Sequence, residues 1–195
     1  MNLPNFLTMV RIVLAPVFMA LFIVDNAWAK FWAMIIFIVA ALTDLFDGYY
    51  ARKYGISTSF GKFFDPLADK ILTSLAFIAF VALGYVQMWM VLLIILREFL
   101  ITGLRTIAAY RGVLITPSWS AKAKTFLQMT SITVILLVIN ARTFLPLLEI
   151  EWPWLKSPAP ERMIFWLMFA TVAITVGTGI DYLWKSLYLL RNTMK

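Results

Sequence analysis

Four aspartates lie close together in a chain that is otherwise strongly apolar. The four are Asp44, Asp47, Asp65 and Asp69, and the chain has only ten acidic residues in all. If both halves of this window are helical, the first pair lies three residues apart on one helix face and the second pair lies four residues apart on another. Two such helices, joined by a turn around residues 53–59, would direct four carboxylates at a common point.

Clustered carboxylates need a counter-charge. They repel each other, and partial burial raises the free-energy cost of that repulsion. Hard oxygen ligands suit Mg²⁺, Mn²⁺ or Ca²⁺, and two such ions together form a clamp for phosphoryl groups. The window therefore favours bound divalent cations acting on a phosphoryl substrate, and raised carboxyl pKa values are the other way to relieve the repulsion. The alternative, four solvated acids on a loop, does not explain the shared helix faces.

Small residues and one cation accompany the aspartates. Gly48 and Ala51 continue the stripe of the first pair, and Gly61 lies one helix turn before Asp65. Residues without bulk leave space for a large ligand, and Arg52 adds a cation that can pair with phosphate.

The whole pattern is D-x-x-D-G-x-x-A-R-x8-G-x-x-x-D-x-x-x-D, from Asp44 to Asp69. It resembles the signature of the CDP-alcohol phosphatidyltransferases, and all eight specified positions are filled. The resemblance implies that the four aspartates bind two divalent metals, which hold the diphosphate of a CDP-linked lipid, and that Asp69 is the catalytic base. The small residues and Arg52 would then accommodate the cytidine.

Three further segments resemble one branch of this family, the bacterial phosphatidylglycerophosphate synthases. They are N-L-P-N-F-L-T-M-V-R at 2–11, R-E-F-L-I-T-G-L-R at 97–105 and A-K-A-K-T at 121–125. This resemblance implies transfer of a phosphatidyl group from CDP-diacylglycerol to glycerol 3-phosphate, with CMP released. It also implies a homodimer, and it places Asn5 and Thr8 near the lipid nucleotide. One departure is Ala121, where the family usually has glycine.

Charged residues also interrupt an apolar stretch farther along the chain. An isolated ionisable group inside a membrane costs about 2.5–3.5 kcal/mol, so such groups normally face a partner or a substrate. We therefore expect Arg97, Arg105 and Lys122 to bind the phosphate of the acceptor, since Arg offers a bidentate fork and Lys a point charge. The alternative is an internal pair between Arg97 and Glu98 that only holds helices together.

The composition is that of a polytopic membrane protein. Of 195 residues, 63% are hydrophobic, and the mean hydropathy is +0.88. The chain has no cysteine and no histidine, which excludes thiol nucleophiles, disulfides and imidazole catalysis. The net charge of +7 suits an anionic membrane surface or anionic substrates. Because the basic residues are scattered between apolar stretches, we do not expect nucleic acid as a partner.

Apolar stretches separated by turns predict an all-α fold with six transmembrane helices in one domain, residues 1–195. The stretches are 8–25, 30–52, 61–83, 86–111, 125–141 and 163–180. Residues 1–11 are expected to form a short interfacial helix. A signal peptide is the alternative for the first stretch, because Ala27-Trp28-Ala29 resembles a cleavage site. Trp28 and Trp32 better suit an interfacial aromatic belt.

Lysines and arginines predict the orientation. With a cytosolic N-terminus, the cytosolic segments hold Arg11, Arg52, Lys53, Lys62, Arg111, Lys122, Lys124, Lys185, Arg191 and Lys195. The external segments hold Lys30, Arg142, Lys156 and Arg162. This bias predicts that both termini and the active site lie on the cytosolic side of the inner membrane.

Two other functions remain open at this point. The same type of transferase could use serine, inositol phosphate or phosphatidylglycerol as its acceptor, although a phosphorylated acceptor suits the basic residues better. A divalent-cation transporter is a remote alternative. It would need acids near mid-membrane along a path through both faces, whereas the four aspartates are expected near one face.

Overall fold

The computed structural model describes the backbone of residues 3–54, 59–110 and 119–193, and the side chains of residues 6–43, 67–68, 70–106 and 123–184. These residues form helices and contain no strand, which confirms the all-α prediction. The elements are α1 (Leu3–Ile23), α2 (Ala27–Tyr54), α3 (Ser59–Ala82), α4 (Met88–Tyr110), α5 (Trp119–Phe144), a 3₁₀ turn η1 (Leu145–Leu148), α6 (Pro153–Lys156) and α7 (Ala159–Thr193).

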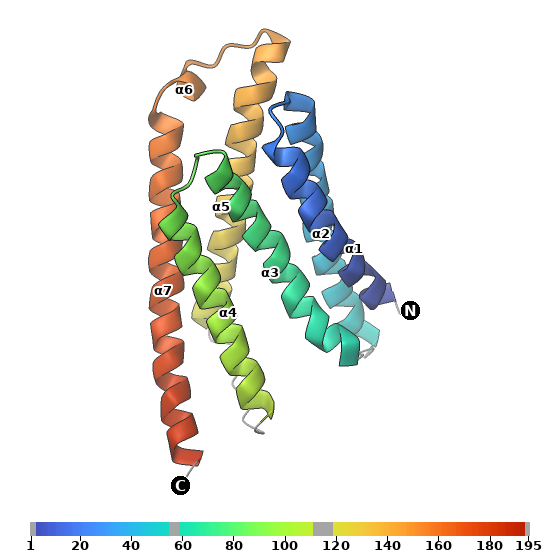
Figure 1. The fold of residues 1–195 in the computed structure, drawn as a ribbon, viewed down its shortest axis with the longest axis vertical. Helices are drawn as coiled ribbons and strands as arrows, with labels where there is room; N and C mark the ends of the chain where they lie inside the picture. Colours follow the sequence, from blue (N-terminus) through green and yellow to red (C-terminus); the bar gives the residue numbers. More distant parts are fainter. Residues whose placement is uncertain (1–2, 55–58, 111–118, 194–195) are drawn as a thin grey trace.

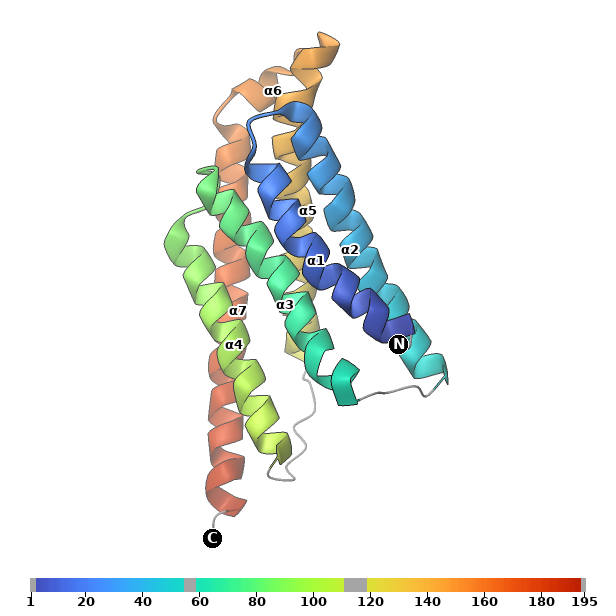
Figure 2. The ribbon, with the colours of Figure 1, turned by 45° about the vertical axis from the view of Figure 1, so that its right-hand side comes forward.

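The six long helices form a bundle in which the chain passes repeatedly between two ends (Figures 1 and 2). α1 packs against α2 and α3, whereas α7 packs against α4 and α5. The lower end in Figure 1 holds both termini, the end of α2 and the start of α3, and we call it the motif end. The upper end holds the α3–α4 turn and α6, and we call it the loop end.

Three of the described helices contain a segment long and apolar enough to cross a membrane. These segments are Phe6–Ile23, Ala123–Leu148 and Ala159–Trp184. In the described parts of α2 and α3, the apolar segments are Ala27–Thr43 and Lys70–Ala82, and the aspartate pattern lies between them in the sequence. In α4, the charged residues Arg97, Glu98 and Arg105 interrupt the apolar stretch. Six long helices are thus present, while six membrane crossings remain a prediction.

The expected separate interfacial helix is absent from the described N-terminal region. α1 runs without a break from Leu3 to Ile23, because no residue between 9 and 12 ends a helix. Pro16 lies inside α1, where it removes one backbone hydrogen bond but does not end the helix. Phe18 and Phe22 of α1 are completely buried in the bundle, which favours a retained helix over a signal peptide.

The turn predicted at Gly84 is confirmed. Gly84 has a φ of +76°, a left-handed conformation that favours glycine, and it follows the last turn of α3. The Gly84 amide donates to the carbonyl of Val81 at 2.9 Å, and the Tyr85 amide donates to that of Phe80 at 3.0 Å. This pair of bonds closes the helix in a Schellman motif and returns the chain toward the motif end as α4.

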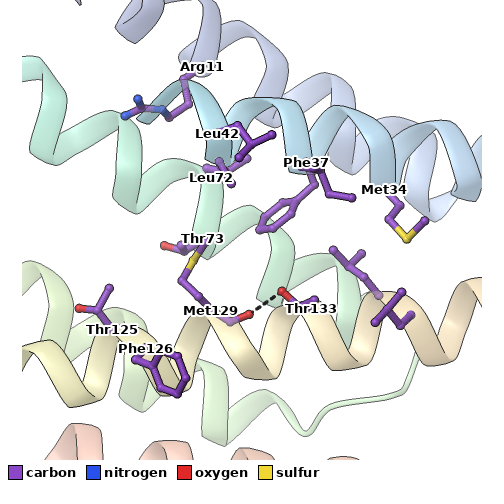
Figure 3. A pocket seen from close by; sticks show the side chains of 14 residues that line it. Arg11, Met34, Phe37, Leu42, Leu72, Thr73, Thr125, Phe126, Met129 and Thr133 are labelled. Atoms are coloured by element: carbon purple, nitrogen blue, oxygen red, sulfur yellow. Dashed lines mark hydrogen bonds between the residues drawn. The ribbon is translucent and has the colours of Figure 1, made fainter. Parts of the chain in front are cut away.

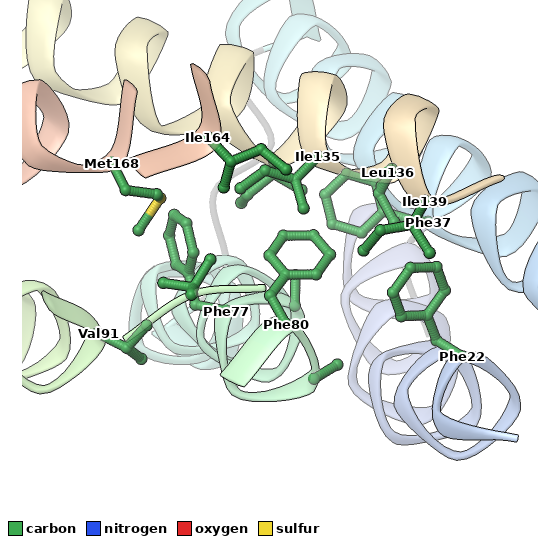
Figure 4. Packing of buried hydrophobic residues seen from close by; sticks show 14 of the residues in the cluster. Phe22, Phe37, Phe77, Phe80, Val91, Ile135, Leu136, Ile139, Ile164 and Met168 are labelled. Atoms are coloured by element: carbon green, nitrogen blue, oxygen red, sulfur yellow. The ribbon is translucent and has the colours of Figure 1, made fainter. Parts of the chain in front are cut away.

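Aromatic rings join the first three helices. Phe18 of α1 lies 5.4 Å from Phe37 of α2, and Phe22 of α1 lies 5.8 Å from Phe80 of α3, between ring centroids. Aliphatic side chains of α5 and α7 cover the other side of this cluster (Figure 4). Close packing is what holds helices together in a lipid environment, where the hydrophobic effect between them is weak. The cluster therefore fixes how α2 and α3 approach each other.

Arg142 ties the elements of the loop end together. Its Nε donates to the carbonyl of Leu155 at 2.9 Å, and its Nη1 donates to Glu161 at 3.0 Å. Its guanidinium also lies 5.8 Å from the centroid of the Tyr85 ring. One side chain thus connects α5, α6, α7 and the α3–α4 turn.

Candidate active site

The aspartate pattern lies on two helix ends at the motif end. Asp44 and Asp47 lie in the C-terminal half of α2, and Asp65 and Asp69 lie in the N-terminal half of α3. The helical premise of the sequence analysis is therefore confirmed for both halves of the pattern. Most of the predicted metal-binding and lipid-binding side chains lie outside the described residues: Asn5, Asp44, Asp47, Gly48, Ala51, Arg52, Gly61, Asp65 and Asp69. That the four carboxylates converge on one point stays a prediction.

A largely buried cluster of charges includes Lys70, the residue that follows Asp69. Lys70 of α3 donates to Oε2 of Glu98 at 3.4 Å, and Lys124 of α5 donates to Oε1 of the same carboxylate. Arg97 and Gln128 also donate to Oε1, at 3.3 and 3.4 Å. We call Lys70, Arg97, Glu98, Lys124 and Gln128 the Glu98 cluster. It joins α3, α4 and α5 near the motif end.

The Glu98 cluster has an excess of positive charge. Among the described side chains, three cations surround one carboxylate, a formal charge of +2, and the exposed fraction of these four side chains is 8–14%. Charges removed from water are costly unless opposite charge balances them. The predicted Arg97–Glu98 pair is therefore present, but it does not balance the cluster. An anionic ligand would supply the missing negative charge.

The two arginines of α4 reach different surroundings. Nη2 of Arg97 donates to the hydroxyl of Thr178 in α7 at 3.4 Å, and its buried Nε has no hydrogen-bond partner among the described residues. Arg105 is exposed at the motif end, and its guanidinium lies 5.7 Å from the centroid of the Tyr182 ring. Lys122 lies in the first turn of α5, and its side chain is outside the described residues.

An apolar cavity of about 460 Å³ lies between α1, α2, α3 and α5 (Figure 3). Its polar lining residues are Arg11 of α1, Thr73 of α3, and Thr125 and Thr133 of α5. Its walls are apolar and include Phe37 and Met129. Arg11, which the orientation count placed in a cytosolic segment, is fully buried here.

Comparison with known proteins identifies the family. The model of the CDP-alcohol phosphatidyltransferases matches residues 1–177. The chain belongs to this family. The predicted resemblance is thus confirmed over most of the sequence and not only over the aspartate pattern.

Three relatives show how far the similarity extends. A protein of Bacillus subtilis (strain 168) is 36% identical over 98% of this chain and 98% of its own length. One of Escherichia coli (strain K12) is 40% identical over 97% and 93%, and one of Rickettsia typhi is 46% identical over 70% and 76%. All three are named CDP-diacylglycerol–glycerol-3-phosphate 3-phosphatidyltransferase.

The residues present fit the divalent metal that a CDP-alcohol phosphatidyltransferase requires. Among the described side chains, no group of three acidic residues could hold a metal ion. The four aspartates of the pattern are carried by the ends of α2 and α3, which lie at the same end of the bundle. Four carboxylates without thiol or imidazole neighbours form a donor set for a hard cation such as Mg²⁺ or Mn²⁺.

The structure brings together residues that the sequence patterns did not select. Lys70 and Gln128 join the Glu98 cluster although neither belongs to a predicted site. The sequence could have pointed to two of these residues. Lys124 lies in the same A-K-A-K-T segment as Lys122, and Lys70 directly follows Asp69. Thr8, predicted near the lipid nucleotide, is completely buried in α1.

Proposed function

We propose that this chain transfers the phosphatidyl group of CDP-diacylglycerol to glycerol 3-phosphate, yielding phosphatidylglycerol phosphate and CMP. The observation that carries the proposal is the complete aspartate pattern on two helix ends, next to a buried cluster with an excess of positive charge. The first feature suits the diphosphate of the donor, and the second suits a phosphorylated acceptor. The names of full-length relatives agree with this pairing of substrates.

The donor is bound at both of its chemically distinct ends. Gly48, Ala51 and Gly61 leave room for the cytidine, and Arg52 lies near its phosphates. Asn5 and Thr8 of α1 approach the nucleotide from the N-terminal side. The apolar cavity between α1, α2, α3 and α5 has a lining that suits an acyl chain of the donor.

Asp44, Asp47, Asp65 and Asp69 would hold two Mg²⁺ or Mn²⁺ ions. Such ions supply electrostatic stabilisation of negative charge on the phosphates and on the departing CMP. The aspartates orient the donor through this clamp.

Asp69 takes the proton from the acceptor hydroxyl. The hydroxyl oxygen forms a bond to the phosphorus of the phosphatidyl group, and the bond from that phosphorus to the oxygen of CMP breaks. CMP leaves with the electron pair of the broken bond. No covalent enzyme intermediate is needed, which fits a chain without cysteine or histidine.

The acceptor phosphate binds to Arg97, Arg105 and Lys122. Lys70 and Lys124 support this site from the Glu98 cluster, whose formal charge of +2 the phosphate would neutralise. Charge-assisted hydrogen bonds from arginine and lysine are the strong contacts for such a dianion.

The chain lies in the inner membrane as one domain, residues 1–195, with six crossings. Both termini and the active site are cytosolic, which agrees with the position of the termini at the motif end. At the loop end, the exposed Trp152 and the exposed Trp28 at the start of α2 suit the external interface. The active form is a homodimer.

A release assay tests the proposal. The purified chain in mixed micelles with CDP-diacylglycerol should release CMP with glycerol 3-phosphate, and much less with serine, inositol phosphate or phosphatidylglycerol. A preference for serine would overturn the choice of acceptor but keep the reaction class. Absence of CMP release with every acceptor would contradict the proposed reaction itself.

A further inference from the structure

α7 contributed no residue to the predicted site, yet it contacts both arginines of α4. α4 and α7 pack side by side and run in the same direction toward the motif end (Figure 1). Arg97 and Arg105 lie eight residues apart in α4, which places them on one helix face. The facing residues of α7 are Thr178, Gly179 and Tyr182.

Gly179 provides the space through which Arg97 passes. A Cβ atom at position 179 would lie 2.9 Å from Cγ of Arg97 and 3.3 Å from its Nε. The neighbouring Thr178 hydroxyl accepts a hydrogen bond from Nη2 at 3.4 Å. Any larger residue at 179 would therefore displace the arginine stem and change where its guanidinium lies.

Tyr182 provides a flat surface for Arg105. The guanidinium lies 5.7 Å from the ring centroid, within the range of a cation–π contact. The ring is largely buried, so its position is fixed by the helices around it. The Tyr182 hydroxyl is buried without a hydrogen-bond partner among the described residues, so the ring and not the hydroxyl makes this contact.

We infer that Thr178, Gly179 and Tyr182 of α7 are positioning residues for the acceptor site. They hold Arg97 and Arg105 in the orientation in which the two guanidiniums bind the phosphate of the acceptor. The inference rests on the proposed role of these arginines. It gives a function to a part of the chain that the motifs of the sequence do not reach.

The Gly179→Ala variant tests the space around Arg97, and Gly177→Ala is its matched control. A Cβ at position 177 meets no atom within 4 Å, and both changes replace a glycine in the same helix. A misplacement of a fraction of an ångström should raise the acceptor KM of Gly179→Ala about three- to thirtyfold, because a shift near 1 Å can cost about a hundredfold. The KM for CDP-diacylglycerol and the thermal midpoint should match those of Gly177→Ala.

The double variant Arg97→Ala/Gly179→Ala separates positioning from packing. If Gly179 acts through Arg97, the double variant should be no worse than Arg97→Ala alone, because residues that act as one unit are not additive. Additive effects would overturn the inference. Equal acceptor KM values for Gly179→Ala and Gly177→Ala would overturn it as well.

Tyr182 is tested by comparing two substitutions. Tyr182→Leu removes the ring and should raise the acceptor KM about two- to fivefold, the range of an exposed cation–π contact. Tyr182→Phe keeps the ring and should restore most of that loss. An equal increase in both variants would show that the hydroxyl matters and would overturn the role of the ring.

Arg97→Ala and Arg105→Ala, measured in the same assay, distinguish a wrong acceptor site from a wrong positioning role for α7. If neither changes the acceptor KM, the proposed acceptor site is wrong, and positioning by α7 falls with it. If both raise the acceptor KM while the α7 variants behave like their controls, the acceptor site stands and the inference about α7 is overturned.

Discussion

At the scale of single residues, charge balance decides which side chains this membrane protein can bury. Glu98 forms ion pairs with three cations, and it is the one acidic residue in the described part of this cluster. The four aspartates present the opposite situation, with negative charge concentrated on two helix ends. In the proposed function, divalent metals balance the aspartates and the acceptor phosphate balances the Glu98 cluster.

Asp65→Asn should lower CMP release at least about a hundredfold, because metal stabilisation of phosphate charge contributes several kcal/mol and about 1.4 kcal/mol corresponds to tenfold. The measurement is CMP release at saturating Mg²⁺, with folding checked by the thermal midpoint. Asp25→Asn is the control, since Asp25 is a fully exposed acid between α1 and α2. Substantial activity of Asp65→Asn, or activity that survives full chelation, would contradict the metal site.

Glu98→Gln should destabilise the fold, because removal of one partner from a buried ion cluster costs about 3–5 kcal/mol. Three largely buried cations would then lack their carboxylate. Added phosphate should restore more stability in this variant than in the unchanged chain, since the anion would take the place of the missing charge. Thermal unfolding with phosphate or chloride at equal ionic strength measures both effects.

Glu161→Gln is the matched control for that experiment. Glu161 also pairs with an arginine, but its side chain is 61% exposed at the loop end. An exposed pair contributes about 0–1 kcal/mol, so this variant should unfold close to the unchanged chain and show no particular response to phosphate. Equal phosphate responses in the two variants would argue against an anion site at the Glu98 cluster.

At the scale of elements, helix ends and turns place the reactive groups. The aspartates lie in the C-terminal half of α2 and the N-terminal half of α3. The phenylalanines of α1, α2 and α3 set the approach of these helices, and the turn at Gly84 returns the chain as α4 with its arginines. The site therefore depends on contacts far from the reacting atoms.

Gly84→Ala should destabilise the chain by about 1 kcal/mol, because a residue with a side chain is strained in the left-handed conformation. The added Cβ would meet no atom within 4 Å, so backbone strain is the expected cause. Gly177→Ala lies within helix α7 and should be neutral or stabilising by up to about 1 kcal/mol. Thermal unfolding of the two variants makes the comparison, and a Gly84→Ala variant as stable as Gly177→Ala would contradict the strain.

At the scale of the whole molecule, the bundle has two chemically different ends. The motif end carries the aspartate pattern, and the exposed Arg105 and Trp184 lie near it. The loop end carries exposed tryptophans and the Arg142 contacts that connect α5, α6 and α7. This polarity agrees with an enzyme that takes water-soluble glycerol 3-phosphate from one side and a lipid from the membrane.

Single cysteines should label from opposite sides of the membrane. The native chain has no cysteine, so Lys156→Cys at the exposed loop end and Asn192→Cys near the C-terminus each introduce one reactive thiol. The distribution of lysine and arginine predicts external labelling of the first and cytosolic labelling of the second. Labelling of Lys156→Cys only from the cytosol would contradict the six-crossing topology.

Much of the fold could be predicted from local patterns. Apolar stretches led to the six long helices, and Gly84 marked the turn, since both depend on residues that are neighbours in sequence. The prediction of a separate interfacial helix was wrong, because no residue between 9 and 12 ends α1. The burial of Arg11 could not be predicted either, because it depends on how α1 sits against α2, α3 and α5.

The sequence by itself determined the reaction class, because the aspartate pattern is a set of residue types at fixed spacing within one window of the chain. The tertiary structure decided what surrounds that pattern. Glu98 meets Lys70 and Lys124 across 28 and 26 residues of sequence, and Arg97 meets Thr178 across 81. Spacing along one helix specifies which residues share a face, but only the packing of helices against one another specifies which faces meet.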